Sequence, residues 1–578
     1  MADPRDINRW RKGKEEWNEW AESDAASSVD FSNEQFGSHA VFDEFIFPAG
    51  SKFQRCRFNR GASFRECIFR GEVDFNHAQA DDLNFEHAKF HDSANFDHLT
   101  CNEICSFEKA IFYKNAKFDS IQFLKGSNFK NVEFKQEASF QQTRIQSEAL
   151  FELCKFLDRT DFSGAQLSKS IFDSATFKRD ISFNGVRFEG NTSFKNISIG
   201  RTSSFNVQNS NATESLDFSG SVIIGKYRLI NLNAKGKVDY SKTKFSSVAI
   251  FEECTFESEF VFKDSSFQKN SKPSFRATKF MSGANFENLR CLSEISFESG
   301  SIDNNGLMSF HKASFSHDVD YRFFIFDQPV SFVDADFHGQ ADFRNIRAKY
   351  EFDLSGARFR NVPNFLFSQF SEPPSFEGVT VSDPLNRQVP SGAADCRPNF
   401  LKWFGIARNS ESSLKYRKLK SLAIDGHDHR RELDFFAGEI QAKRFWHDKA
   451  TSAAFIFGLV YEWTSNFGRS LIRPLIGLAG TMTFFSIVYL LARGACTSSE
   501  CGMCDSVLAG DALALSFVHS FPFLFWGRSE TLKSVSFCLY GQSSLPLEIV
   551  IIAVLQNVIS IVFVFLILLA LRNQFKIR

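Results

Sequence analysis

Four cysteines near the C-terminal end have a spacing that suits thiol chemistry. Cys496, Cys501 and Cys504 form a C-x4-C-x2-C pattern, and Cys538 follows later in the chain. Four thiols are enough for one tetrahedral zinc site or for two disulfide bonds. We favour disulfides, because the elements considered below place these cysteines on the oxidising side of a membrane. No bound metal or cofactor is therefore expected.

Two apolar stretches near the C-terminus are interrupted by polar side chains. The first stretch runs from Asp511 to Trp526 and the second from Ile549 to Leu571. A polar group at membrane depth is costly unless it faces water or a partner, or bonds to a neighbouring helix. These side chains are therefore candidates either for lining a pore or for joining helices, and their spacing leaves both interpretations open. They are Ser516, His519, Ser520, Gln556, Asn557 and Ser560.

The motifs of common enzyme classes are absent from the sequence. It contains no P-loop, no nucleophile elbow and no spacing that suits a catalytic triad. The run His427-Asp428-His429 matches no standard metal site and lies in a predicted turn, so we interpret it as a solvated loop. The 67 basic residues nearly balance the 68 acidic residues, which gives no indication of nucleic-acid binding. We expect a protein that is not an enzyme and that binds no nucleic acid.

Two uncharged stretches are long enough to cross a membrane as helices. Residues 474–492 are 19 residues without a charge, and residues 549–571 are 23. Both satisfy the length needed for a hydrocarbon core of about 30 Å. Basic residues flank the outer ends of this pair: Arg469, Arg473, Arg572, Lys576 and Arg578. The positive-inside rule then places both flanks in the cytoplasm and the loop 494–548 outside.

The segment of about 511–526 is too apolar for an ordinary exterior loop. A third full span would carry Asp511, His519 and Pro522, and it would move the basic tail to the outside. A re-entrant half-helix satisfies both the hydropathy and the charge rule, provided that protein or a cavity surrounds it. Residues 469–578 are thus predicted to form a membrane domain in the order span, half-helix, span. That order resembles the pore of two-span channels, although the potassium filter T-V-G-Y-G is absent.

The 72 phenylalanines concentrate before residue 380 and recur at fixed intervals. One series runs Phe31, Phe42, Phe53 in steps of eleven, and an interleaved series begins with Phe36 and Phe47. In the first series a small or branched residue lies two positions before each member, and turn-prone polar residues follow. Two apolar positions separated by a polar one are typical of a strand, and short strands joined by repeated corners predict a parallel β-solenoid.

Five cysteines occupy the small-residue position of this repeat. Each lies two residues before a phenylalanine, so we interpret all five as reduced core residues rather than disulfide partners. They are Cys56, Cys67, Cys105, Cys154 and Cys254.

The repeat resembles the pentapeptide-repeat family, whose unit is roughly A-(D/N)-(L/F)-x-x. The best matches are Ala341-Asp342-Phe343, Phe352-Asp353-Leu354-Ser355-Gly356 and Thr160-Asp161-Phe162-Ser163-Gly164. The resemblance implies a right-handed quadrilateral β-helix over residues 31–378, with the phenylalanine and the small residue pointing inward. Turns of roughly 22 residues give about 15 turns and a rod on the order of 70 Å long. Residues 1–30 are expected to form a helical cap over the open strand edges.

A helical linker is predicted between the rod and the membrane domain, over residues 379–468. Its first part is rich in Pro, Gly and Ser, and the apolar spacing then predicts helices over Ser412–Ala423 and His429–Phe445. The stretch Ala453–Trp463 is apolar but too short to span, which favours an interfacial helix lying on the bilayer.

The whole chain resembles bacterial pentapeptide-repeat membrane proteins with a C-terminal two-helix, channel-like tail. We therefore expect a multi-pass protein of the bacterial inner (plasma) membrane with both termini in the cytoplasm. Its partners would be the lipid bilayer, further copies of itself, and an unidentified cytoplasmic protein or ligand on the rod. The leading hypothesis is an oligomeric, ion-channel-like pore that the rod gates or regulates. The alternative is a membrane-tethered scaffold that conducts nothing.

Overall fold

A computed structural model describes most of the chain, as two compact units. The units are Met1–Asp383 and Pro384–Arg578, and each is considered by itself. The side chains of residues 508 and 528–531 are not described. The described residues are 2–24, 26–303, 305–382, 405–407, 410–492, 508–521 and 528–575.

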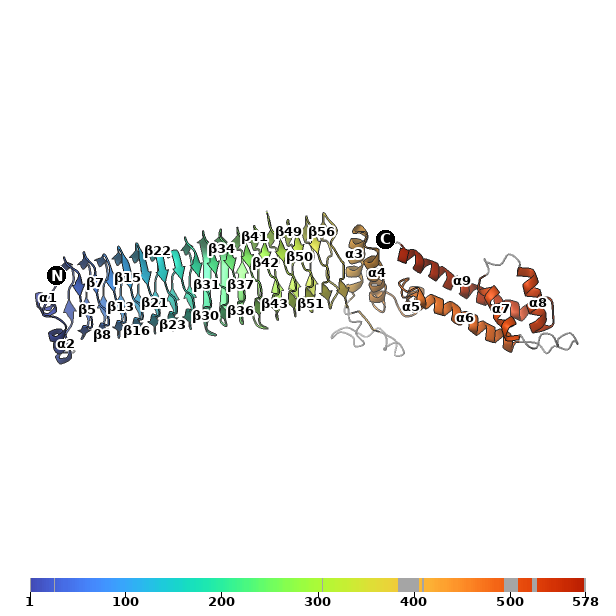
Figure 1. The fold of residues 1–578 in the computed structure, drawn as a ribbon, viewed down its shortest axis with the longest axis horizontal. Coiled ribbons are helices and arrows are strands. Elements are labelled where there is room, and N and C mark those ends of the chain that lie inside the picture. Colours follow the sequence, from blue (N-terminus) through green and yellow to red (C-terminus); the bar gives the residue numbers. More distant parts are fainter. Residues whose placement is uncertain are drawn as a thin grey trace. The chain divides into compact units, whose positions relative to one another are not determined.

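The first unit is a parallel β-solenoid in which a regular coil has four short strands (Figure 1). Its first coil contains β1 (Val29–Asp30), β2 (Gln35–Phe36), β3 (Ala40–Val41) and β4 (Ile46–Phe47), and β5 (Ser51–Lys52) begins the next. Val29 pairs with Ser51 in parallel register, which gives the expected coil of about 22 residues. One face stacks 16 strands from β4 to β57 (Thr380–Val381). The predicted four-sided solenoid is confirmed.

The core of the solenoid is a ladder of phenylalanine rings, one stack for each inward-facing column. Phe42 and Phe64 are both fully buried and stack with ring centroids 4.7 Å apart. Rings from neighbouring columns meet edge to face, as Phe53 and Phe64 do at 5.4 Å. Ala62, two positions before Phe64, is also fully buried. Both predicted inward positions are confirmed, and the two ring geometries are those that aromatic quadrupoles favour.

Irregularities in the repeat change the length of a coil without breaking the ladder. Leu83 pairs with Ala62, so this coil is one residue shorter, yet Phe64 and Phe85 still stack at 4.9 Å. Further along, β31 (Ser204–Ala212) and β34 (Lys226–Ala234) are long paired strands. There Tyr227 stacks on Phe205, and its hydroxyl meets that of Tyr240 at 2.5 Å in the core. A buried tyrosine needs such a partner for its hydroxyl.

Cysteine, serine and threonine at the small-residue position bond to the backbone of the preceding coil. The Cys56 thiol donates to the Phe31 carbonyl at 2.9 Å, and the Thr143 hydroxyl donates to the Phe118 carbonyl at 2.7 Å. All five predicted core cysteines are free and buried, as expected. Burial raises the pKa of the Cys56 thiol to about 12, so the thiol stays protonated and unreactive.

Two short helices cover the first coil. They are α1 (Pro4–Trp10) and α2 (Lys14–Ser23). Trp17 is fully buried and donates from its indole nitrogen to the Ile46 carbonyl at 2.8 Å. The Asp6 carboxylate accepts the Asp30 amide at 2.9 Å. These contacts satisfy backbone groups that an open strand edge would leave unpaired.

The second unit is helical. Its paired linker helices are α3 (Ser412–Asp425) and α4 (His429–Lys443), followed by α5 (Ala453–Ser465) where an interfacial helix was predicted. The two long helices α6 (Ile472–Leu491) and α9 (Leu547–Phe575) are long and apolar enough to cross a membrane.

Between these two lie two shorter helices, α7 (Leu508–Ser520) and α8 (Arg528–Tyr540). The half-helix was predicted over about 511–526. The structure begins it earlier and ends it at Ser520, and residues 522–526 lie outside the described residues. Helix α8 was not predicted, because its residues form no sustained apolar stripe.

Candidate functional site

Four of the six polar candidates meet between α7 and α9. The Gln556 side-chain nitrogen lies 2.7 Å from the Ser516 hydroxyl, 2.8 Å from the Ser516 carbonyl and 2.9 Å from the Ser520 hydroxyl. The Ser560 hydroxyl lies 3.3 Å from that of Ser520. All four side chains are fully buried. The structure thus brings Ser516, Ser520, Gln556 and Ser560 into one polar cluster.

Helical spacing places these residues opposite one another. Ser516 and Ser520 are four residues apart on α7, and Gln556 and Ser560 are four apart on α9, so each pair shares a helix face. In an apolar surrounding, such bonds between helices contribute roughly 0.6–2 kcal/mol each. The cluster therefore fastens the short helix α7 to the long helix α9.

Helix α6 joins the same cluster through Tyr489, which the sequence did not single out. The Tyr489 hydroxyl donates to the Gln556 side-chain carbonyl at 2.7 Å, and Tyr489 is fully buried. The Ser516 hydroxyl donates to the Met482 carbonyl at 2.8 Å. Tyr489 is the one tyrosine of the uncharged stretch 474–492, and that was the signal available for this role. With it, α6, α7 and α9 form one hydrogen-bonded set.

The other two candidates lie at the margin of the cluster. The His519 ring is largely buried, with its centroid 6.4 Å from that of Tyr489. Asn557 is partly exposed, and its side-chain oxygen is buried without a hydrogen-bond partner in the described part of the chain. Asn557 therefore carries a buried polar atom that would need water or another molecule as its partner.

The cysteine candidates are only partly described. Cys538, in α8, is disulfide-bonded. Every other cysteine within the described ranges is free, so the partner of Cys538 lies outside them, as do Cys496, Cys501 and Cys504. Among described side chains there is no group of three His, Cys, Asp or Glu that suits a metal ion.

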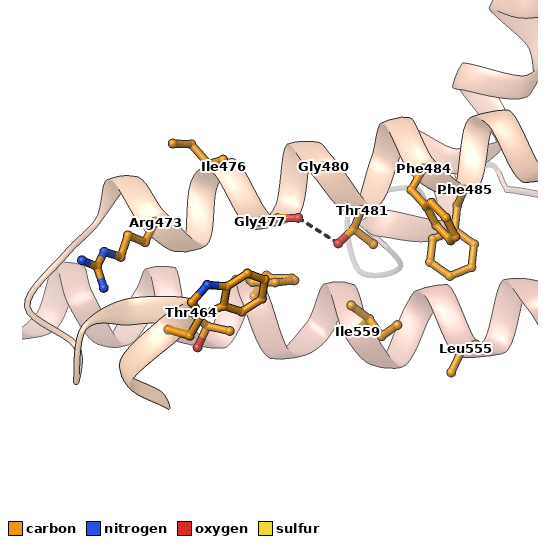
Figure 2. A pocket seen from close by; sticks show the side chains of 12 residues that line it. Thr464, Arg473, Ile476, Gly477, Gly480, Thr481, Phe484, Phe485, Leu555 and Ile559 are labelled. Carbon is orange, nitrogen blue, oxygen red and sulfur yellow. Dashed lines mark hydrogen bonds between the residues drawn. The ribbon is translucent and has the colours of Figure 1, made fainter. Parts of the chain in front are cut away.

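Beside the polar cluster runs an open apolar groove of about 860 Å³, bounded by α5, α6 and α9 (Figure 2). Gly477 lets α9 approach, because a Cβ there would lie 2.2 Å from a ring carbon of Phe563. Gly480 faces open space, with no atom within 4 Å of an added Cβ. The two glycines have different roles: one sets the packing of the helices, and the other leaves the groove hollow.

Basic residues gather where α6 begins and α9 ends. The Arg473 guanidinium donates to the Glu462 carbonyl at 3.1 Å, and Arg469 pairs with Asp434 at 3.1 Å. Asn573, near the end of α9, donates to the Gly468 carbonyl at 3.4 Å. The two long helices are therefore antiparallel, with Arg469, Arg473 and Arg572 at the same end.

Comparison with known proteins identifies the repeat. Residues 53–100 and 151–198 match the family model described as pentapeptide repeats (9 copies). The predicted pentapeptide repeats are thereby confirmed, and two apolar C-terminal helices accompany them.

A solved structure also matches: HetL, a pentapeptide-repeat protein involved in heterocyst differentiation regulation, from the cyanobacterium Nostoc sp.. It is 10% identical, and the match covers 66% of this chain and 98% of HetL with a TM-score of 0.13. A likeness at that TM-score carries no argument. No curated protein matches the chain.

Proposed function

We propose that this chain, a pentapeptide-repeat solenoid followed by two helices apolar enough to cross a membrane, is an oligomeric, channel-like protein of the bacterial inner membrane. Its solenoid and both termini lie in the cytoplasm, where the solenoid binds a protein or ligand and regulates the membrane domain. The observation that carries the proposal is the short helix α7, which Gln556 ties between α6 and α9 through buried hydrogen bonds. A short helix fixed at membrane depth between two spans is the arrangement of a pore domain.

Two features support the orientation. Arg469, Arg473 and Arg572 share one end of the two spans, in agreement with the positive-inside rule. Cys538 is disulfide-bonded, which suits an oxidising compartment. The Tyr540 hydroxyl, two residues beyond Cys538, donates to the Tyr489 carbonyl near the far end of α6, so the disulfide lies away from the basic end.

Asn557 supports assembly into an oligomer. Two spans and a half-helix are too small to enclose a water path alone, so a pore requires several copies around an axis. The side-chain oxygen of Asn557 is buried and lacks a partner among the described residues, and in a bilayer this atom would need water or a neighbouring copy. A pore wall between copies supplies both.

A non-conducting, membrane-tethered scaffold is the second candidate. It is favoured by the four clustered side chains, which are fully buried within one protomer. Ser516, Ser520 and Gln556 bond to one another rather than facing open space. Polar residues in this state join helices and leave fewer groups to line a path.

Mass measurement and bilayer recording on the full chain separate the two candidates. The channel proposal expects an oligomer in mild detergent and discrete currents in planar bilayers. Asn557→Leu should change the unit current, whereas Val558→Leu, at an exposed apolar neighbour, should not. A monomer in several mild detergents together with silent bilayers would overturn the channel and leave the scaffold.

A further inference from the structure

From the groove of Figure 2, we propose a binding site for one anionic phospholipid of the cytoplasmic leaflet. The lipid phosphate lies against Arg473, and one acyl chain follows the groove past Gly477 and Gly480. This inference rests on the proposed function in one respect only, namely that α6 and α9 cross the membrane with Arg473 on the cytoplasmic side.

The walls of the groove suit an acyl chain. On α6 they are formed at helical spacing by Ile476, Gly480 and Phe484, and on α9 by a stripe with a period of four residues. That stripe is Leu555, Ile559 and Phe563. Both hydroxyls of the lining are already bonded within their own helices: Thr481 donates to the Gly477 carbonyl at 2.8 Å, and Thr464 donates to the Val460 carbonyl at 2.6 Å. Neither therefore requires a polar occupant. An apolar occupant therefore leaves no wall group of this groove unsatisfied.

The length of the groove matches one leaflet. Figure 2 shows Arg473 at one end and Phe484 and Phe485 at the other. Eleven residues of helix separate Arg473 from Phe484, a rise of about 16 Å at 1.5 Å per residue. The hydrocarbon core is about 30 Å thick, so the groove reaches from the interface to about the midplane. One acyl chain of a single leaflet spans that distance.

The polar end of the groove selects the headgroup. Arg473 is exposed and has no carboxylate partner within the described ranges, and its guanidinium donates to the Glu462 carbonyl. A guanidinium carries five donors, which leaves several to receive a phosphate. Trp463, 81% exposed, borders the same end, where indole rings prefer the membrane interface.

This charge favours a lipid over a second copy of the chain as the occupant. The exposed faces of α6 and α9 are apolar, and such a face pressed into the groove would bring no anion to Arg473. An anionic lipid supplies the apolar chain and the counter-charge in one molecule.

The test measures lipid retained by the full-length protein after reconstitution with phosphatidylglycerol or phosphatidylcholine and transfer to mild detergent. A Cβ at Gly480 would meet no atom within 4 Å, so Gly480→Leu adds its side chain to the open groove, and Ala479→Leu is the matched control on an exposed site outside the groove. We expect the wild type and Ala479→Leu to retain one phosphatidylglycerol per chain. Gly480→Leu should weaken retention by about tenfold or more, as a shift of some 1.4 kcal/mol requires.

Arg473→Gln should abolish the preference for phosphatidylglycerol over phosphatidylcholine, and Arg473→Lys should restore part of it.

Inorganic phosphate should not displace the lipid; displacement would assign the Arg473 end to a soluble anion and overturn the lipid site. Equal retention by Gly480→Leu and Ala479→Leu would also overturn it. So would a smaller assembly in Gly480→Leu with unchanged lipid, which would assign the groove to a second copy. A chain released from membranes by carbonate would instead refute the membrane proposal itself.

Discussion

At the residue scale, one position in a recurring corner of the solenoid has a left-handed backbone conformation, whichever residue type occupies it. The corner after Phe31 is closed by a bond from the Glu34 amide to the Phe31 carbonyl at 3.0 Å, and Asn33 within it has φ 65°. The same conformation recurs at intervals of ten or eleven residues as far as Leu153, which has φ 59°. It costs an ordinary residue roughly 1–2 kcal/mol. Gly164, with φ 72°, occupies the next such corner after Leu153 without that cost.

Leu153→Gly should therefore stabilise the solenoid. Leu153 is 48% exposed, so little packing is lost. The strain energy that the change removes exceeds the entropic cost of the more flexible glycine. We therefore expect a gain of about 0.5–1 kcal/mol in the free energy of unfolding. Denaturant unfolding followed by circular dichroism measures it.

Two further variants control for side-chain loss. Leu153→Ala keeps the strain and should give no such gain. Gly164→Ala should lower the free energy of unfolding by about 1 kcal/mol, because alanine is strained in the left-handed conformation. A steric clash does not contribute, since the added Cβ would meet only ordinary contacts, the nearest at 3.5 Å from Gln142. A stabilised Leu153→Ala variant would contradict the backbone explanation.

Glu439 holds three basic side chains of the α3–α4 pair. Its carboxylate is buried and lies 3.0 Å from Arg417, 2.6 Å from Lys420 and 2.8 Å from Lys443. Burial opposes its ionisation, but hydrogen bonds from the three cations more than offset this and lower the pKa of Glu439 to about 2. The charged form is therefore stabilised by the folded helices.

This lowered pKa predicts an acid-sensitive helix pair. The folded pKa of Glu439 lies below its ordinary value of 4.5, so the stabilisation is complete above about pH 4.5 and is lost as the pH falls toward 2. It amounts to something on the order of 3 kcal/mol. Glu439→Gln should lower the free energy of unfolding by about this amount at pH 7 and by almost nothing at pH 2. The measurement is the difference in the free energy of unfolding between the two proteins across that pH range. A pH-independent difference would contradict the ion-pair explanation.

At the scale of elements, the phenylalanine ladder should carry the stability of the strands. Phe118 is fully buried and stacks at 5.0 Å on Phe96 and at 4.7 Å on Phe140. Phe118→Ala should lower the free energy of unfolding by about 3–5 kcal/mol, from lost burial and the cavity that remains. Lys117→Ala, at the adjacent exposed position, should change it by less than about 0.5 kcal/mol. Similar losses in the two variants would argue against the inward assignment.

The ladder could be predicted because each inward position repeats with every coil and depends on neighbours of the same type. The corner conformation could not, since nothing about Leu153 signals a positive φ, whereas Gly164 does. The Glu439 ion pairs also escaped prediction, because Arg417 and Lys420 lie on a different helix. In the candidate site, helical spacing grouped Gln556 with Ser560. Tyr489 joined them only through the packing of α6, which no local pattern reveals.

At the scale of the whole molecule, helix lengths constrain how often the chain can cross a membrane. Helices α6 and α9 have 20 and 29 residues, whereas α7 and α8 have 13 each. Thirteen residues extend about 20 Å, which is too short for a core of about 30 Å. With two crossings, the start of α6 and the end of α9 lie on the same side of the membrane. The hydrogen bond between Asn573 and Gly468 requires this arrangement.

Labelling of introduced cysteines tests this topology. Ser543, between α8 and α9, and Gln574, in the last turn of α9, are both exposed, so a cysteine at either position reacts if the reagent reaches it. In intact spheroplasts, a membrane-impermeant maleimide should label Ser543→Cys at once and Gln574→Cys only after lysis. The unsubstituted protein supplies the background, and the cysteines within the solenoid are buried and therefore shielded from the reagent. Labelling of position 574 before lysis would place the end of α9 outside, together with the start of α6, because Asn573 contacts Gly468. The basic end of the hairpin would then face outward, and the cytoplasmic lipid site at Arg473 would be refuted with it.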